Sequence, residues 1–162
     1  MSYLIDGNNV MGQRVGWHRD KPAARRTLLD ELAGFARARR VKLEVVFDGA
    51  PEAHFADGAS YRGTVRVFYA ARGSNADERI KSFVEASRER RTLVVVTSDR
   101  ALAEYVRRCG AQVVRAGEFR RVLDEVKVET EQATRGEVEP GVGAADMNEW
   151  MRYFGADESD DE

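Results

Sequence analysis

Apolar and polar residues follow two different periods along the first 126 residues. Short, mostly apolar runs predict five strands, at 3–5, 41–47, 64–70, 92–97 and 111–114. Longer stretches with apolar residues three and four positions apart predict four helices, at 22–38, 76–88, 101–108 and 117–126. This alternation of strands and helices favours an α/β fold in three layers, with a mainly parallel sheet between helices. The run 92–97 is almost wholly apolar, as expected for a strand covered on both faces.

Two stretches of this first part show no regular pattern. Residues 7–21 are polar and contain glycine, and we expect a loop there before Pro22 begins a helix. Residues 49–63 contain Pro, Gly, Asp and Ser and predict a long loop. That loop is long enough for a parallel crossover, although it shows no clear helical pattern.

The character of the chain changes after Val126. Residues 129–143 are polar and resemble a linker, and 156–162 form an acidic tail that we expect to be disordered. Between them, a short amphipathic helix is predicted by Met147, Trp150, Met151 and Phe154. We therefore divide the chain into a domain at 1–126, a linker with a short helix at 127–155, and a tail at 156–162.

The net charge of −2 conceals two parts of opposite sign. Residues 1–126 hold 23 Lys and Arg against 17 Asp and Glu, whereas 127–162 hold 3 against 11. A basic body suits a polyanion such as nucleic acid, although arginine-rich codon usage would give a similar composition.

Composition also excludes several classes of protein. The single cysteine, Cys109, rules out an internal disulfide and a cysteine-based zinc site, and we assign no metal role to His18 or His54. No apolar run approaches the roughly 20 residues needed to span a bilayer, and the N-terminus lacks a signal-peptide pattern. We expect a cytoplasmic protein that does not bind a membrane.

Acidic residues follow three of the predicted strands. Asp6 and Asp48 directly follow predicted strands, and Asp99 follows the strand at 92–97 after one serine. Asp77 lies in the first turn of the helix after the third strand. The carboxyl ends of parallel strands are where open α/β sheets bind ligands. If the first strand is central, the four carboxylates converge and repel one another, which calls for a cation. Oxygen ligands of this kind favour Mg²⁺ or Mn²⁺, which can activate a water for phosphodiester hydrolysis.

Each aspartate also has a purely structural interpretation. Asp99 could cap the following helix, Asp48 with Gly49 could form a turn, and Asp77 could match the helix dipole. Only their shared location favours chemistry.

Five short motifs resemble those of YacP-like NYN domains, which belong to the PIN-like nuclease superfamily. They occur in order across residues 1–126 and read Ile5-Asp6-Gly7-Asn8-Asn9-Val10, Val46-Phe47-Asp48-Gly49, Asn75-Ala76-Asp77-Glu78-Arg79-Ile80, Val96-Thr97-Ser98-Asp99-Arg100, and Gly110-Ala111-Gln112-Val113 followed by Glu118-Phe119. The resemblance implies a Rossmann-like α/β/α fold with five strands in the order 3-2-1-4-5 and metal-dependent RNA cleavage.

The resemblance also assigns roles to individual residues. It implies that Asp6, Asp77 and Asp99 bind metal and that Asp48 is a further catalytic acid. Asn9 would hold a carboxylate or the substrate. Ser98 and Arg100, on either side of Asp99, are candidate phosphate contacts. Glu78 stands where relatives often carry a second aspartate.

The leading hypothesis is a metal-dependent endoribonuclease that acts in RNA processing or decay. The alternative is a non-catalytic RNA-binding module of the same fold. Phosphotransfer domains are disfavoured. The haloacid-dehalogenase type needs a second aspartate where this chain has Asn8, and a receiver domain needs a lysine after the last strand, where this chain has Arg115. We expect RNA as the partner, presented by a larger complex such as a ribosome, and we expect no small-molecule cofactor.

Overall fold

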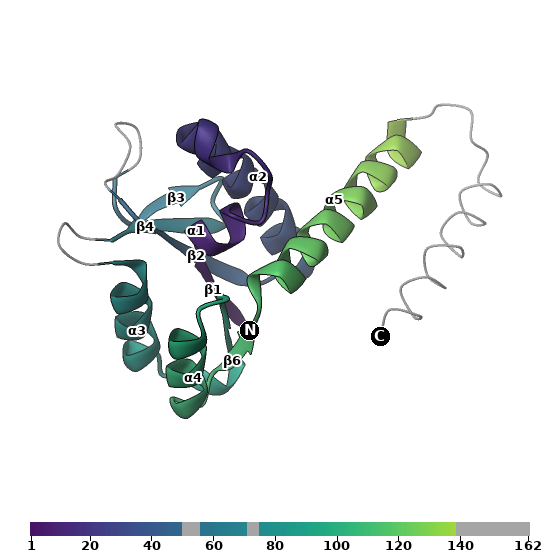
Figure 1. Cartoon of the computed structure of the whole chain (residues 1–162). Coiled ribbons are helices and arrows are strands. Elements are labelled where there is room, and N and C mark those ends of the chain that lie inside the picture. The colour runs from purple at the N-terminus through teal and green to yellow at the C-terminus, as the bar shows by residue number, and fades with distance from the viewer. Residues whose placement is uncertain (50–55, 71–74, 139–162) are drawn as a thin grey trace. The chain divides into compact units, whose positions relative to one another are not determined.

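The computed structural model describes residues 1–49, 56–70 and 75–138, with side chains as far as 133. Its strands are β1 (Ser2–Asp6), β2 (Lys42–Phe47), β3 (Ala59–Tyr61), β4 (Val65–Tyr69), β5 (Leu93–Val96) and β6 (Gln112–Val114). Its helices are α1 (Gly7–Met11), α2 (Lys21–Arg39), α3 (Ala76–Ala86), α4 (Arg100–Arg108) and α5 (Ala116–Val138), with 3-10 turns η1 (Trp17–Arg19) and η2 (Arg90–Thr92). The α/β fold is as predicted (Figure 1).

The sheet has six strands, so the prediction of five was wrong and the complete order differs from the expected one. The observed order is β3-β4-β2-β1-β5-β6, in which β3 alone runs antiparallel. The added strand β3 lies at the edge, inside the stretch expected to be a loop, and pairs with β4 through a tight turn at Arg62 and Gly63. Three residues are too few to show a strand period, which is why the sequence pattern missed it. The other five strands follow one another as β4-β2-β1-β5-β6.

Helices cover both faces of the sheet, and every strand except β3 contributes side chains to both cores. Along β1, Ile5 packs on the side of α2 and the start of α5, whereas Leu4 packs on the side of α3 and α4. The first side also holds an aromatic cluster in which Tyr3 and Phe119 both contact Phe35, with ring centroids 5.1 Å apart in each pair. Period-2 alternation along central strands therefore divides the core into two layers.

The helix expected at 117–126 begins at Ala116 and continues to Val138, so the linker predicted from 129 is helical at its start. The sequence after Val126 is rich in good helix formers and contains no proline before Pro140, which explains the extension. Residues 1–127 form one compact unit and 128–162 another. Within the described part of the chain, no helix is long and apolar enough to cross a membrane. The expected helix at 147–154, the tail at 156–162 and His54 lie outside the described residues.

Parallel pairing gives the sheet two chemically distinct edges. Ser2 aligns with Lys42 and with Leu93, so the strand starts of β1, β2 and β5 lie together at what we call the amino edge. The strand ends lie at the opposite edge, here called the carboxyl edge. At about 3.3 Å per residue, the five residues of β1 separate the two edges by roughly 17 Å.

Candidate functional site

The chain turns directly from β1 into α1 at Asp6. Gly7 allows this turn, because a Cβ atom there would lie 2.6 Å from the Phe47 ring. Asp6 precedes the helix as its N-cap residue but makes no capping hydrogen bond through its side chain. The buried Asp6 carboxylate lies at the carboxyl edge, where it accepts a hydrogen bond from the Thr97 hydroxyl instead of capping α1. The loop expected from residue 7 was wrong here, since a five-residue helix lies below the length that periodicity can detect.

Two asparagines on α1 tie this corner to the neighbouring strands. Asn8 Oδ1 accepts a hydrogen bond from the Asp48 N–H at 3.0 Å, beyond the end of β2. Asn9 Oδ1 accepts from the Ser98 N–H at 2.8 Å, beyond the end of β5. The role implied for Asn9 was contact with a carboxylate or the substrate, whereas its carboxamide oxygen binds backbone. Together the two amides fix the loops that carry Asp48 and Asp99 relative to Asp6.

The Asp48 carboxylate connects β2 to the start of α3. Its Oδ1 accepts a hydrogen bond from the Ala76 N–H at 2.8 Å, which brings Asp48 beside Asp77. Arg25 of α2 donates to the Asp48 carbonyl at 2.6 Å and stacks over the rings of Phe47 and Tyr69. Asp48 thus has a structural role in addition to its place among the acids.

Asp99 caps α4, as the structural interpretation predicted. Its Oδ1 accepts a hydrogen bond from the Leu102 N–H at 3.0 Å. Thr97 joins it to Asp6, because the Thr97 hydroxyl donates to Asp6 Oδ2 at 3.0 Å and accepts from the Asp99 N–H at 3.2 Å. Thr97 is buried and was missed by sequence reasoning, although a hydroxyl that ends an otherwise apolar strand two residues before an acid was a usable signal.

The environment of Asp6 raises its pKa from 3.8 to about 7. Burial is the main cause, and the charges of Asp77 and Asp48 add to it, while the hydrogen bond from Thr97 acts in the opposite direction. A carboxyl group with a pKa near neutrality can be ionised or protonated under ordinary conditions. Perturbation of this size by burial and like charges is typical of functional sites.

Asp77 and Asp99 share a hydrogen bond that shifts the pKa values of the two carboxyl groups in opposite directions. Burial and the Asp99 charge raise the pKa of Asp77, whereas the Leu102 N–H and Asp77 hold the pKa of Asp99 below its usual value. Lys81, one turn further along α3, favours the ionised form of both. Lys81 is a second residue that sequence reasoning missed, and its place four residues after Asp77 was the available signal.

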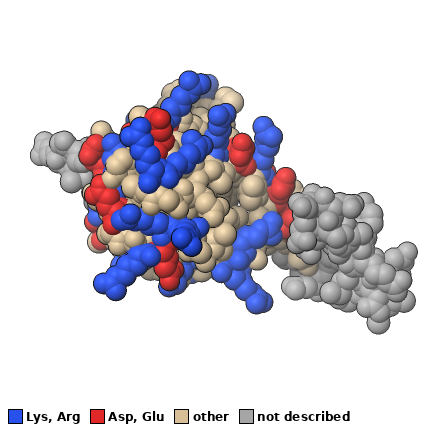
Figure 2. Space-filling view, turned by 90° about the horizontal axis from the view of Figure 1, so that it is seen from below, with Lys and Arg blue, Asp and Glu red and all other residues tan. Residues whose placement is uncertain are grey.

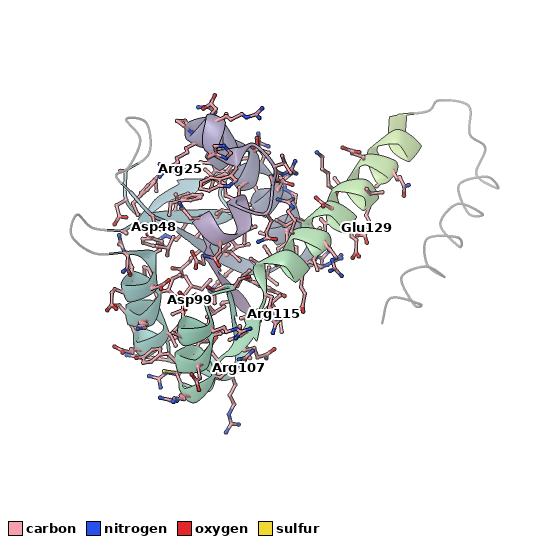
Figure 3. All side chains as sticks on the ribbon, viewed as in Figure 1. Arg25, Asp48, Asp99, Arg107, Arg115 and Glu129 are labelled. Atoms are coloured by element: carbon pink, nitrogen blue, oxygen red, sulfur yellow. The ribbon has the colours of Figure 1, made fainter. Side chains whose placement is uncertain are left out.

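The remaining expected residues lie at the same edge. Ser98 is exposed, and its Oγ accepts a hydrogen bond from the Ala116 N–H at 3.1 Å, which anchors the start of α5. Arg100 is exposed beside Asp99, and the Glu78 carboxylate is 3.7 Å from Lys81. Hydrogen bonds therefore hold Asp6, Asp48, Asp77 and Asp99 close enough for their charges to repel one another. Figure 3 labels two of the four, Asp48 and Asp99.

The donor set at this edge has the chemistry of a site for a hard cation. All four acids offer oxygen ligands, and neighbouring carboxylates add to burial in raising the pKa values of Asp6 and Asp77, an effect that a bound cation would oppose. Within residues 1–49, 56–70 and 75–138, however, no three His, Cys, Asp or Glu side chains already have the arrangement of a metal site. The carboxylates thus fit a metal by charge and ligand type.

Comparison with known proteins agrees with the fold. The structure of Rae1 (YacP) from Bacillus subtilis is similar, with a TM-score of 0.69 and 24% sequence identity over 99% of this chain and 96% of that one. Its W164L mutant matches with a TM-score of 0.68 and 24% identity over 83% and 81%. No curated protein is significantly similar in sequence. The model of the YacP-like NYN domain, a nuclease-type domain, matches residues 3–148, and the chain therefore belongs to this family.

Proposed function

We propose that the protein is a metal-dependent endoribonuclease that hydrolyses RNA phosphodiester bonds at the carboxyl edge. The observation that carries the proposal is the Asp6 carboxylate, which is buried among like charges and has a pKa of about 7. Burying such a group costs stability, and the hydrogen bond from Thr97 offsets only part of that cost. The family is nuclease-type, which supports phosphodiester chemistry at this site.

Asp6, Asp77 and Asp99 would hold Mg²⁺ or Mn²⁺, with Asp48 beside them. A metal ion bound there would supply an activated water and stabilise the leaving oxygen. Thr97 holds the Asp6 carboxylate in place, and Asn9 holds the backbone at Ser98, next to Asp99. Arg100, and Ser98 through its hydroxyl, would contact phosphate from the rim of the site. Rigid support of this kind keeps the acids in a fixed arrangement while substrate exchanges.

A cleavage assay on RNA with analysis of the product ends tests the proposal. Attack by water in line with the leaving group leaves a 5′-phosphate and a 3′-hydroxyl. Attack by the ribose 2′-hydroxyl would leave a 2′,3′-cyclic phosphate. We expect Mn²⁺-dependent cleavage with 5′-phosphate ends, and activity that survives EDTA or gives cyclic ends would contradict the site. RNA binding without cleavage would favour the non-catalytic module instead.

A further inference from the structure

The amino edge of the sheet carries an unusual concentration of arginine. Three segments enter this edge, one before each of β2, β5 and β6, and they span residues 37–42, 87–92 and 107–112. Together they contain nine Lys and Arg and a single acid, Glu89. We call these three segments the arginine edge.

Helix dipoles explain only part of this charge. Cations favour helix C-termini, and the last turns of α2 and α4 do end in arginines. The last turn of α3 has no basic residue, and Arg88, Arg90 and Arg91 follow after that helix has ended. Arg40 and Lys42 likewise lie beyond the end of α2. The arginines of 87–92 therefore need another explanation.

Most of these side chains are exposed and available to a ligand. Arg88, Arg91 and Arg107 are all exposed. Their guanidinium groups form no ion pair or hydrogen bond with another described residue. Arg108 forms a 3.8 Å pair with Glu104, and Arg90 donates to the Glu85 carbonyl. Figure 2 shows a face of the molecule on which Lys and Arg cover more of the surface than Asp and Glu.

The surface at this edge is hollowed where the arginines gather. A depression of about 770 Å³ is lined by residues 87–92 together with Met1, Cys109 and Gly110. A concave surface with one sign of charge concentrates the field and attracts ions of the opposite sign. Guanidinium groups match phosphate in particular, because they donate two parallel hydrogen bonds.

We propose that the arginine edge is a second RNA-binding surface, which holds the phosphate backbone of a folded RNA away from the carboxyl edge. The three segments lead into β2, β5 and β6, and β1 lies between β2 and β5 in the sheet. At about 4.8 Å between neighbouring strands, the row from β2 to β6 is roughly 14 Å long. Such a row can follow several phosphates of one backbone. The choice of RNA as the polyanion rests on the proposed function.

The two edges cannot be reached by the same short RNA. Figure 3 places Asp99 and Arg107 at opposite ends of α4, and the strands separate the edges by roughly 17 Å. A dinucleotide bound at the acids would leave the arginine edge empty, because one strand advances only about 3.4 Å per phosphate in a helix. A long structured RNA can contact both, so the arginine edge affects long substrates selectively.

The test compares a triple variant, Arg88→Gln/Arg91→Gln/Arg107→Gln, with two controls in an Asp77→Asn background. The charge control replaces the same three residues by lysine. The position control is Arg19→Gln/Arg26→Gln/Arg121→Gln, which removes three exposed arginines of η1, α2 and α5. The probe is a folded RNA of about 40 nucleotides, titrated from low to physiological salt.

We expect the glutamine variant to bind the folded RNA at least about tenfold more weakly at low salt. The slope of log Kd against log salt should fall by about 3, one for each lost phosphate contact. The lysine variant should bind like the unmodified arginine edge. Equal affinity and slope in the glutamine variant, or an equal loss in the position control, would overturn the proposal.

A cleavage assay in the wild-type background separates this inference from the proposed function. The glutamine variant should cleave an RNA dinucleotide within twofold of wild type and the folded RNA about tenfold more slowly. If neither the wild-type protein nor any variant cleaves RNA but the arginine edge still controls binding, the proposed function fails and the inference stands. If cleavage of both RNAs is unchanged by the glutamine substitutions and binding is also unchanged, the inference fails alone.

Discussion

The two edges of the sheet carry opposite charge in opposite structural settings. At the carboxyl edge, acids are held by specific hydrogen bonds, and Asp6 is buried. At the amino edge, the guanidinium groups of exposed arginines such as Arg88 and Arg107 have no hydrogen-bond or ion-pair partner among the described residues. Buried charge perturbs proton affinity and depends on exact geometry, whereas exposed charge acts over several ångströms and is screened by salt. The difference indicates chemistry at one edge and long-range attraction at the other.

The largest effect is expected when one half-buried acid of the carboxyl edge is neutralised. Asp77→Asn should lower cleavage by about 10³-fold, because a carboxylate that would bind the metal becomes neutral. The same change should raise the melting temperature without divalent ions, since it removes a charge that Asp6 and Asp99 oppose. Glu104→Gln on α4 is the matched control, because this exposed carboxylate does not belong to the acids of the site. Full activity in Asp77→Asn, measured on total RNA with Mn²⁺, would refute the proposed mechanism.

The sequence located the acids but not the contacts that place them. Strand ends and their aspartates were visible in the pattern, as was Asp77 in the first turn of a helix, and the resemblance added Asn9, Ser98 and Arg100. The hydroxyl of Thr97 was not recognised, because its partner Asp6 is 91 positions away along the chain. Nothing local in a sequence reports such a pairing.

Short elements were missed for a related reason. The helix α1 has five residues and β3 has three, so neither completes enough periods to be detected. The extension of α5 past Val126 was missed because its polar residues resembled a linker, although helix propensity alone favoured continuation. Composition did show that the body is basic, whereas the gathering of arginines at one edge depends on which strands are parallel neighbours.

The pH dependence of the unfolding free energy should show a smaller effect than the loss of cleavage, and it should arise from Asp6 at the carboxyl edge. Because the pKa of Asp6 is raised to about 7 on folding, the native state holds a proton that the unfolded state releases near pH 4. Stability should therefore fall as pH rises from about 4 to 7 and then level off, by at most about 4 kcal/mol. Asp6→Asn should flatten this decline.

Urea unfolding at pH 5.5 and pH 8 without divalent ions measures the effect. Glu104→Gln, on an exposed face of α4, should leave the decline unchanged. A wild-type protein equally stable at both values would show that Asp6 is not buried as a carboxylic acid. Added Mg²⁺ should restore more stability at pH 8 than at pH 5.5, because it favours the ionised acids.

Removal of the exposed arginines should have little effect on stability. Each of the substitutions Arg88→Gln, Arg91→Gln and Arg107→Gln should change the unfolding free energy by no more than about 0.5 kcal/mol, since no described partner loses a contact. A loss of several kcal/mol in any one of them, measured by urea unfolding, would mean that the arginine edge is part of the structural framework.

The smallest expected effect concerns the acidic residues at the end of the chain. Residues 156–162 contain five acids and are tethered to a basic body, at an effective concentration of about millimolar order. An anionic segment held in this way should compete with RNA phosphates, and salt should weaken both contacts. Deletion of 156–162 should therefore tighten binding of the folded RNA severalfold at low salt, with the difference shrinking as salt rises. If the competition occurs at the arginine edge, the deletion should have no effect in the Arg88→Gln/Arg91→Gln/Arg107→Gln variant. Equal affinities of full-length and shortened protein at every salt concentration would leave the acidic residues without a role in RNA binding.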